Sequence, residues 1–358
     1  MARRIVHYSR LLSAFIALPA IVAGCADIKG NMHQVILPHA LQPGDTIAFV
    51  APAGKLDRER MERARQRLEA RGFKVQVPDD LYRTRGYLAG PDDIRARELM
   101  AAFGDPNVNA IFPGTGSYGA TRILDRLDYD VIRENPKIFI GFSDLTALHL
   151  AIQKETGLVT FHSPNPMWGL GSEGNLQPFA ATYFWRALLQ SEYVGADGHP
   201  LSTGYPIVVP EDAPQIEMLR PGIARGRLTG GNLSLVIALM GTEYEIDTAN
   251  RVLFLEDVDE RPYRIDRYLS QLRLAGKLDH LAGVILGQFR GCKPNEGETS
   301  LTLEEVFADY FGELDVPVVK NFPAGHTACN ATLPLNAMVE VDADHRRITV
   351  LENPVRIN

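Results

Sequence analysis

The chain has 358 residues, of which 45% are hydrophobic, 23% charged and 8% aromatic, a composition that suits globular domains and excludes a disordered, collagen-like or coiled-coil protein. Its 37 basic and 44 acidic residues give a formal net charge of -7. This charge disfavours a nucleic-acid-binding protein, because phosphate contacts need clustered Lys and Arg. We therefore expect a small-molecule or peptide substrate.

The first 25 residues have the pattern of a lipoprotein signal peptide. A basic start precedes an apolar run from Leu11 to Ala23 that is too short to span a bilayer, and small residues lead to Cys25. Lipidation of Cys25 would anchor the protein to a bacterial envelope membrane, facing the periplasm. Ala26 favours the outer membrane in a Gram-negative host. An ordinary secretory signal with an incidental thiol is the alternative, and residues 26–40 are predicted to be a tether.

Residues 41–185 are predicted to form an N-terminal domain with a parallel sheet of the flavodoxin or Rossmann kind, because buried strands alternate with amphipathic helices. The expected strands are Thr46–Ala51, Phe73–Val77, Ala110–Phe112 and Lys137–Gly141. The expected helices are Asp57–Ala70 and Asp92–Phe103, with two more beginning at Ala120 and Asp144.

The sequence from 165 to 222 is rich in Pro, Gly and aromatic residues without a clear period, and we assign 186–222 to the crossing between two domains. Residues 223–358 are predicted to form a mixed α/β domain. Its expected strands are Val252–Glu256, Gly283–Leu286, Val316–Asn321, Met338–Val341 and Ile348–Leu351. One expected helix follows Gly230-Gly231-Asn232, and two more are expected at Tyr263–Leu274 and Leu303–Phe311.

Ser143 stands in the sequence Ile-Gly-Phe-Ser-Asp-Leu, between a predicted strand and a predicted helix. A nucleophile elbow occupies this place, because a tight turn exposes the hydroxyl and directs backbone N–H groups to the same point. The match to G-x-S-x-G is partial, since Leu145 replaces the last Gly. A Ser at a helix start also serves as an N-cap.

The segment Gly114-Thr-Gly-Ser-Tyr-Gly119 fits G-x-G-x-x-G between a strand and a helix. Such a turn can bind a dinucleotide, hold an oxyanion on its free N–H groups, or serve only as a turn. Its position on the third strand disfavours a nicotinamide cofactor.

Two further candidates follow predicted strands of the second domain. Glu256 ends a strand and precedes more acids, which suits either a solvated helix start or a site. His326 lies in a loop made rigid by Pro and Gly, which suits a general base. Together with Ser143, both lie where open α/β sheets keep their sites.

Other chemistries lack their motifs. No H-E-x-x-H or Cys pair at zinc spacing occurs, so no metal is expected. Cys292 and Cys329 could form a disulfide in an oxidising compartment, although buried free thiols are the default reading.

Several segments together resemble the LD-carboxypeptidases (muramoyltetrapeptide carboxypeptidases), a family that includes the microcin-immunity serine peptidases. The resemblance covers nearly the whole mature chain and rests on GDTIAFVAPAG, GSYG followed by Arg122, IGFSDLTAL, GGNLSL, LFLEDVDERPYRIDR and FPAGH. It implies a Ser-Glu-His triad at Ser143, Glu256 and His326, in a site between the two domains. It also implies release of the terminal D-alanine from a murein tetrapeptide by cleavage of an L,D bond, without metal or cofactor.

The resemblance further implies an oxyanion hole made by the backbone N–H groups of Ser117 and Asp144, with Gly116 and Tyr118 as candidate substrate contacts. Where the family usually has Arg-Gly-Gly-Tyr-Gly, this chain has Thr115-Gly-Ser-Tyr-Gly. The difference removes a cation and a Gly near the site, which bears on recognition of a substrate carboxylate.

Two other functions stay open. A peptidase of the microcin-immunity type would cleave amides of peptide-nucleotide antibiotics, and an aromatic wall around Trp168 or Trp185 would favour it. A lipoprotein that binds muropeptides without cleaving them is the second. The expected partners are a muropeptide and, through Cys25, a membrane. Relatives commonly form homodimers, but no interface can be identified in the sequence.

Overall fold

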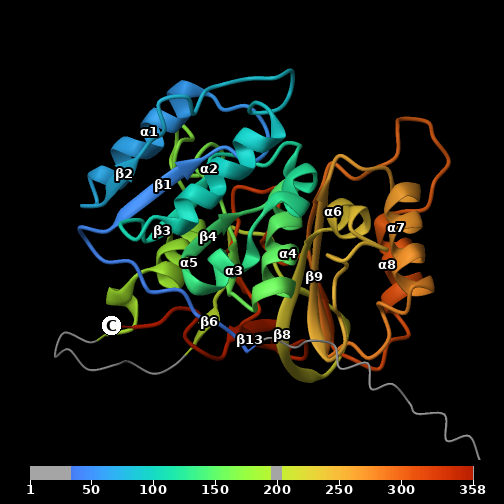
Figure 1. The fold of residues 1–358 in the computed structure, drawn as a ribbon. Helices are drawn as coiled ribbons and strands as arrows, with labels where there is room; N and C mark the ends of the chain where they lie inside the picture. The colour runs from blue at the N-terminus through green and yellow to red at the C-terminus, as the bar shows by residue number, and fades with distance from the viewer. Residues whose placement is uncertain (1–33, 195–203, 358) are drawn as a thin grey trace, which may run out of the picture. The chain divides into compact units, whose positions relative to one another are not determined.

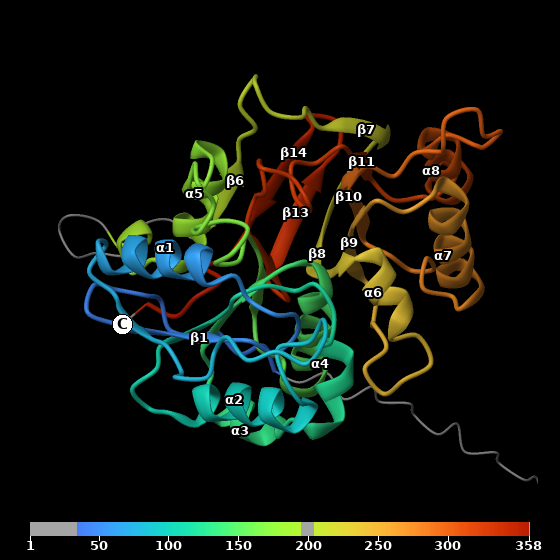
Figure 2. The same ribbon diagram turned by 90° about the horizontal axis from the view of Figure 1, so that it is seen from above.

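The computed structural model describes residues 34–194 and 204–357, which belong to one compact unit built around two sheets (Figures 1 and 2). The predicted signal peptide and Cys25 lie outside the described residues. The described part of the predicted tether joins the fold through a bridge between Ile36 and Leu158. No helix within the described residues has the length and apolarity needed to cross a membrane.

The first sheet has six strands in the order β12-β5-β4-β3-β1-β2. They are β1 (Thr46–Val50), β2 (Lys74–Gln76), β3 (Ala110–Pro113), β4 (Ile138–Gly141), β5 (Thr160–His162) and β12 (Leu333–Leu335). The first five run parallel, and β12 pairs antiparallel with β5, with Pro334 opposite Phe161. A strand from the end of the chain therefore completes the sheet that the beginning of the chain builds.

Helices cover both faces of this sheet, as a parallel sheet requires (Figure 2). On one face are α1 (Arg58–Glu69) and α5 (Pro178–Leu188), and on the other are α2 (Asp92–Gly104), α3 (Tyr129–Glu134) and α4 (Thr146–Thr156). Three 3₁₀ turns connect elements, η1 (Ala120–Arg126), η2 (Ser143–Leu145) and η3 (Gln190–Glu192). Each face of the sheet packs into its own hydrophobic core. Successive residues of β1 point into opposite cores, with Phe49 in one and Val50 in the other.

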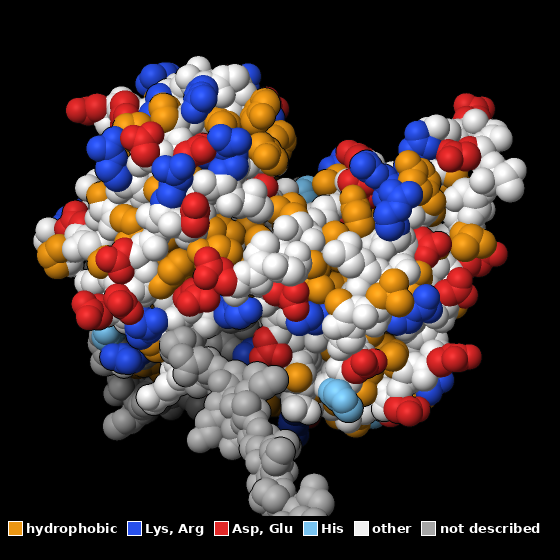
Figure 3. Space-filling model, turned by 45° about the vertical axis from the view of Figure 1, so that its right-hand side comes forward, with side chains coloured by type: hydrophobic (Ala, Val, Ile, Leu, Met, Phe, Trp, Pro, Cys, Tyr) orange, Lys and Arg blue, Asp and Glu red, His pale blue; other side chains and the backbone are white. Residues whose placement is uncertain are grey.

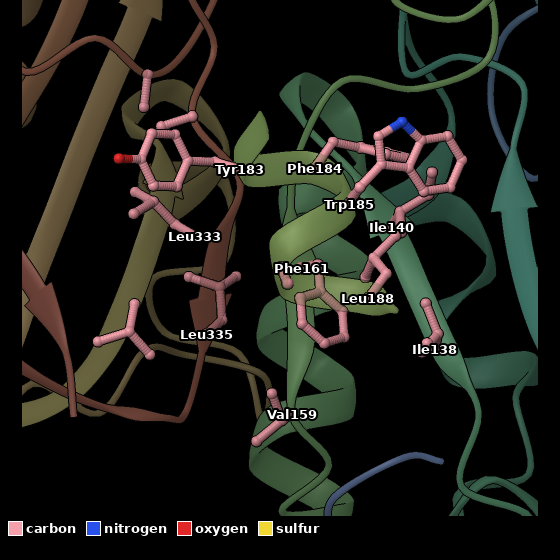
Figure 4. Close-up of a cluster of buried hydrophobic side chains, with 14 of the residues drawn as sticks. Ile138, Ile140, Val159, Phe161, Tyr183, Phe184, Trp185, Leu188, Leu333 and Leu335 are labelled. Carbon is pink, nitrogen blue, oxygen red and sulfur yellow. The ribbon is translucent and has the colours of Figure 1, made fainter. Parts of the chain in front are cut away.

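Helix α5 packs its aromatic face onto the sheet (Figure 4). The cluster combines side chains from three neighbouring strands, and from the residue just before β5, with one helix. They are Ile138, Ile140, Val159, Phe161, Leu333 and Leu335 with Tyr183, Phe184, Trp185 and Leu188. Phe161 is completely buried, and burial of such a side chain contributes roughly 1.5–3 kcal/mol. This cluster fixes β12 to the first sheet.

The second sheet has eight strands in the order β6-β14-β13-β8-β9-β10-β11-β7. Its strands are β6 (Tyr205–Ile207), β7 (Glu217–Arg220), β8 (Ile223–Asn232), β9 (Arg251–Val258), β10 (Gly283–Arg290), β11 (Val318–Lys320), β13 (Met338–Asp342) and β14 (Arg347–Val350). The four central strands β8 to β11 are parallel and the flanking ones antiparallel. Helices α6 (Leu233–Ala238), α7 (Pro262–Leu274) and α8 (Leu303–Phe311) pack on one face.

The predicted fold class is confirmed, with a largely parallel first sheet and a mixed second one. Most predicted strands and helices occur within a few residues of their expected bounds. The helix expected from Ala120 is a 3₁₀ turn. Residues 186–222, which we assigned to the crossing between domains, also contain two strands. These are β6 and β7, and they form the two edges of the second sheet. Their short, Pro-containing or charged sequences carry no clear alternation.

Candidate functional site

Ser143 lies in the tight turn between β4 and α4, and its backbone has a φ of 65°. A positive φ is uncommon for a residue other than Gly and stores strain of about 1–3 kcal/mol. Gly141 makes the turn possible, because its φ is 143° and a Cβ there would lie 2.2 Å from a methyl carbon of Leu145. The turn therefore has the strained strand-to-helix geometry expected of a nucleophile elbow.

A buried histidine supports this turn from behind. The ring of His149 contacts the Gly141 carbonyl oxygen through Nε2 and the Thr160 hydroxyl through Nδ1, both at 2.9 Å. Because a carbonyl can only accept, Nε2 carries the proton and Nδ1 accepts from the hydroxyl. Burial lowers the pKa of His149 to about 4, so the ring is neutral. His149 is a positioning residue for the end of β4.

The loop that follows β3 packs directly on the Ser143 turn. A Cβ on Gly116 would lie 3.0 Å from the Asp144 nitrogen, so any larger residue there would crowd the Ser143 turn. Ser117 also has a positive φ, 66°. The backbone N–H groups of Ser117 and Asp144 donate to no other described residue. The Asp144 carboxylate accepts from the Ala120 N–H at 2.7 Å and so ties the two segments together, and burial raises its pKa.

Glu256 and His326 form a pair in which the carboxylate is buried and the imidazole is partly exposed. Glu256 lies in β9 and is fully buried, and its Oε2 is 2.7 Å from the Nδ1 of His326. Gly325 has a φ of 115°, and a Cβ there would lie 2.7 Å from Oε2. Burial works against the charged imidazole, but the Glu256 carboxylate outweighs burial and raises the pKa of His326 above its ordinary value of 6.5. The carboxylate thus orients the ring and stabilises its protonated form.

The loop that carries His326 is fastened to strand β10. The pairing of β10 with β9 shifts register between Leu286 and Phe289, which is a β-bulge. Within this bulge, the Gln288 N–H donates to the Ala324 carbonyl oxygen at 2.9 Å, and its side-chain amide donates to Asn321 at 2.9 Å. These bonds hold the histidine loop at the carboxyl ends of β9 and β10, where parallel sheets keep their sites.

Ser143 and His326 line the same pocket of about 380 Å³, whose lining residues are Thr115, Gly116, Ser117, Phe142, Ser143, Asn165, Trp168, Arg290, His326, Thr327 and Ala328. The ring of Phe142 meets that of His326 edge to face, with centroids 4.9 Å apart. The Ser143 hydroxyl has no hydrogen-bond partner among the described residues, so it is free to meet a ligand. Figure 3 shows that the surface is hollowed near the top of the view, with acidic and basic side chains interspersed around the hollow.

Comparison with known proteins identifies the family. The chain matches the model of the LD-carboxypeptidase N-terminal domain over residues 47–163 and that of the C-terminal domain over residues 225–341. The chain belongs to the LD-carboxypeptidase family. It is thus a member of a family of serine-type carboxypeptidases, which are hydrolases.

Similar proteins and solved structures agree with this family assignment. A probable murein peptide carboxypeptidase of Bacillus subtilis is 37% identical over 323 residues, which are 90% of this chain and 97% of the relative. The solved structure of the microcin C7 self-immunity protein MccF with aspartyl sulfamoyl adenosine has a TM-score of 0.80 at 26% identity and covers 90% of this chain and 100% of its own. The muramoyltetrapeptide carboxypeptidase of Oxalobacter formigenes has a TM-score of 0.72 at 28% identity, covering 85% and 97%.

Most of the residues expected from the sequence lie together in this member of the family. Gly116, Ser117, Ser143 and His326 line the pocket, and Glu256 lies behind His326. Tyr118 is not among the lining residues. Its ring is 46% exposed and meets Tyr87 edge to face, with centroids 5.4 Å apart.

The two tryptophans considered from the sequence have different places. Trp168 lines the pocket and is 55% exposed, and its indole N–H donates to the Thr115 hydroxyl at 3.0 Å. Trp185 is buried in the cluster under α5 and stacks on Phe73. Of the two tryptophans, Trp168 is therefore the one that can contribute to an aromatic wall of the pocket.

Asn165 and Arg290 line the pocket but were not predicted. Arg290 ends β10, whereas the predicted strand stopped at Leu286, so its place at the carboxyl end of a parallel strand could not be recognised from the sequence. Asn165 lies in the loop after β5, a strand too short to be recognised. Cys292 and Cys329 are both free thiols. Over residues 34–194 and 204–357, no cluster of His, Cys, Asp or Glu is arranged to hold a metal ion.

Proposed function

We propose that this protein is a serine LD-carboxypeptidase that releases the terminal D-alanine from murein tetrapeptides. One observation carries the proposal. Ser143 and His326 line the same pocket, and the Glu256 carboxylate is 2.7 Å from Nδ1 of His326, which leaves Nε2 available to act as the base. Nucleophile, base and orienting acid are the three parts of a catalytic triad. The murein peptide carboxypeptidase relative supports the choice of substrate.

The first half of the reaction forms an acyl-enzyme. His326 takes the proton from the Ser143 hydroxyl through Nε2 while the oxygen attacks the carbonyl carbon of the L,D peptide bond. The N–H groups of Ser117 and Asp144 are free donors beside this point, and they stabilise the oxyanion of the tetrahedral intermediate. The C–N bond then breaks, and His326 returns the proton to the amine of the departing D-alanine.

The second half restores the enzyme. Water attacks the ester carbon, His326 takes a proton from that water, and the intermediate collapses to the tripeptide acid. The proton returns to the Ser143 oxygen as the ester bond breaks. Glu256 keeps its negative charge throughout, since its role is to hold the Nδ1 proton and stabilise the imidazolium.

The direct test is incubation of the full chain in detergent with a murein tetrapeptide, followed by mass spectrometry of the products. We expect tripeptide and free D-alanine, and we expect both to disappear in Ser143→Ala. Ser191→Ala is a matched control, because Ser191 is exposed and does not line the pocket. Binding of the tetrapeptide without any turnover would instead favour the non-catalytic lipoprotein.

A second function is favoured by Trp168. Its half-exposed indole lines the pocket, and the guanidinium of Arg60 lies 4.4 Å from the ring centroid. An aromatic face at a pocket rim can stack a nucleobase, and MccF was solved with aspartyl sulfamoyl adenosine. Faster cleavage of that compound than of the tetrapeptide, lost in Trp168→Ala, would assign the chain to the microcin-immunity type.

We also propose that the protein is a lipoprotein of the bacterial envelope. The support is the sequence alone, in which a basic start, a short apolar run and small residues lead to Cys25. Metabolic labelling with an alkyne fatty acid should mark the full chain and should fail for Cys25→Ser. Equal labelling of both proteins would refute lipidation at this residue.

A further inference from the structure

Arg290 is the only Lys or Arg among the residues that line the pocket, and no Asp or Glu is among them. Its side chain forms no hydrogen bond or ion pair with any other residue that the structure describes. Two arginines that follow the neighbouring strand differ in this respect, because Arg261 pairs with Glu298 and Arg264 pairs with Glu260. The pocket therefore contains one permanent positive charge that no described carboxylate neutralises.

The backbone of Arg290 is firmly held at the end of β10. Arg290 pairs in register with Val258, two positions after Glu256, and its carbonyl oxygen accepts from the Asp259 N–H at 2.8 Å. The same strand carries the bulge residue Gln288, which fastens the His326 loop. The backbone segments that carry the cation and the base are thus fastened to one short stretch of β10, so they are held close to each other before a ligand arrives.

The charge of Arg290 also acts on His326. Burial lowers the pKa of His326, and Arg290 lowers it further, while Glu256, together with a smaller effect of Asp257, raises it and prevails. An anion bound to the guanidinium would cancel the effect of Arg290 and make the imidazole a stronger base. Occupation of the cation by a carboxylate therefore favours the base catalysis that Ser143 needs.

A carboxypeptidase substrate has its anion at a fixed place. The α-carboxylate carbon of the terminal residue is separated from the carbonyl carbon under attack by only the nitrogen and Cα between them. Whatever binds that carboxylate must lie in the pocket that holds Ser143. Thr115, on the opposite segment of the lining, is neutral and bonded to Trp168, and the amide of Asn165 is also neutral. Arg290 is the lining residue whose permanent charge matches that of a carboxylate.

We propose that Arg290 binds the terminal α-carboxylate of the substrate and so restricts cleavage to the last peptide bond. This inference rests on the proposed carboxypeptidase function. The planar guanidinium can donate two parallel N–H bonds to a carboxylate, which fixes the orientation of the terminal residue as well as its affinity. Arg290 is then the specificity-determining residue of the pocket.

The test compares a murein tetrapeptide with the same peptide amidated at its C-terminus, using the full chain in detergent. For Arg290→Gln we expect kcat/KM for the free acid to fall about 10- to 100-fold, mainly through KM, because one charge-assisted contact is lost. The value for the amide should change much less than the value for the free acid, since Arg290→Gln then acts only through the pKa of His326, and Arg290→Lys should keep part of the preference. Arg126→Gln is the control, since Arg126 is exposed and outside the pocket. An equal loss on both substrates, or no loss, would overturn the inference.

Binding to Ser143→Ala separates this inference from the proposed function. Calorimetry should show tighter binding of the free acid than of the amide, and the difference should vanish in Ser143→Ala/Arg290→Gln. If the wild-type protein releases no D-alanine, the proposed function fails, and this binding difference alone decides the role of Arg290. Equal binding of acid and amide to Ser143→Ala would overturn it even if the wild type is active.

Discussion

Replacement of Glu256 by Gln tests the part that the buried carboxylate plays at His326. The carboxylate raises the pKa of His326 against the effect of burial, through a contact of 2.7 Å. A hydrogen bond to a charged group contributes about 1.5–3 kcal/mol, and one pKa unit corresponds to about 1.4 kcal/mol, so its loss should lower the pKa by about 1–2 units. Burial and the charge of Arg290 then outweigh the remaining effect of Asp257, and the pKa of His326 should fall below 6.5.

The consequence for activity has two parts. The base must be neutral, so the rise of kcat/KM with pH follows the pKa of His326 in the free enzyme, and in Glu256→Gln this rise should move to lower pH. The maximal kcat should nevertheless fall on the order of 10⁴-fold, because an amide can donate to Nδ1 and so favour the wrong tautomer. Release of D-alanine between pH 5 and pH 9 measures both quantities.

Asp342→Asn provides the matched control for this experiment. Asp342 contacts the Nδ1 of His345 at 3.0 Å, but this pair lies outside the pocket and the side chain of His345 is 72% exposed. The control should keep the wild-type pH profile, and thermal unfolding should show that both variants are folded. A Glu256→Gln enzyme with the wild-type pH profile and kcat would refute the role assigned to this carboxylate.

Three further substitutions have definite expectations. Gly325→Ala should lower kcat at least about 10-fold, because the new Cβ would lie 2.7 Å from the Glu256 carboxylate and displace it, and normal kinetics would contradict that geometry. Ser117→Gly should keep kcat, because the backbone N–H remains, and loss of turnover would point to the hydroxyl instead. The free energy of unfolding should change by less than about 1 kcal/mol, because relief of the strain at the positive φ offsets the greater chain entropy of Gly in the unfolded state. Phe161→Ala should lower the free energy of unfolding, measured by urea denaturation, by about 3–5 kcal/mol, because it leaves a cavity under α5. A change near zero would mean that the neighbouring side chains fill this cavity.

The sequence predicted the α/β class and most long elements because their hydrophobic periods are regular, as in α8, whose bounds were predicted without error. Strands such as β5 and β12 have three residues each and carry no recognisable period. The pairing of β12 with β5 could not be foreseen, since local pattern says nothing about which edge a late strand joins.

At the site, sequence reasoning identified residues that belong to contiguous motifs. Gly116, Ser143 and His326 were found in this way, and they line one pocket. Arg290 was missed, because its importance arises from being unpaired in a shared pocket, and no sequence pattern records the absence of a partner. Asn165 was missed for a related reason: its place at the lining depends on how the loop after β5 folds back.

The return of β12 to the first sheet has a practical consequence for dissecting this protein. A fragment that ends before Leu333 would leave β5 as an uncovered sheet border, and exposed borders of this kind invite association between copies. Halves made by cutting near the family-domain limits should therefore be insoluble when produced alone and should recover when produced together. Truncation from the carboxyl terminus would damage the serine turn, because β5 also borders the strand that leads into it.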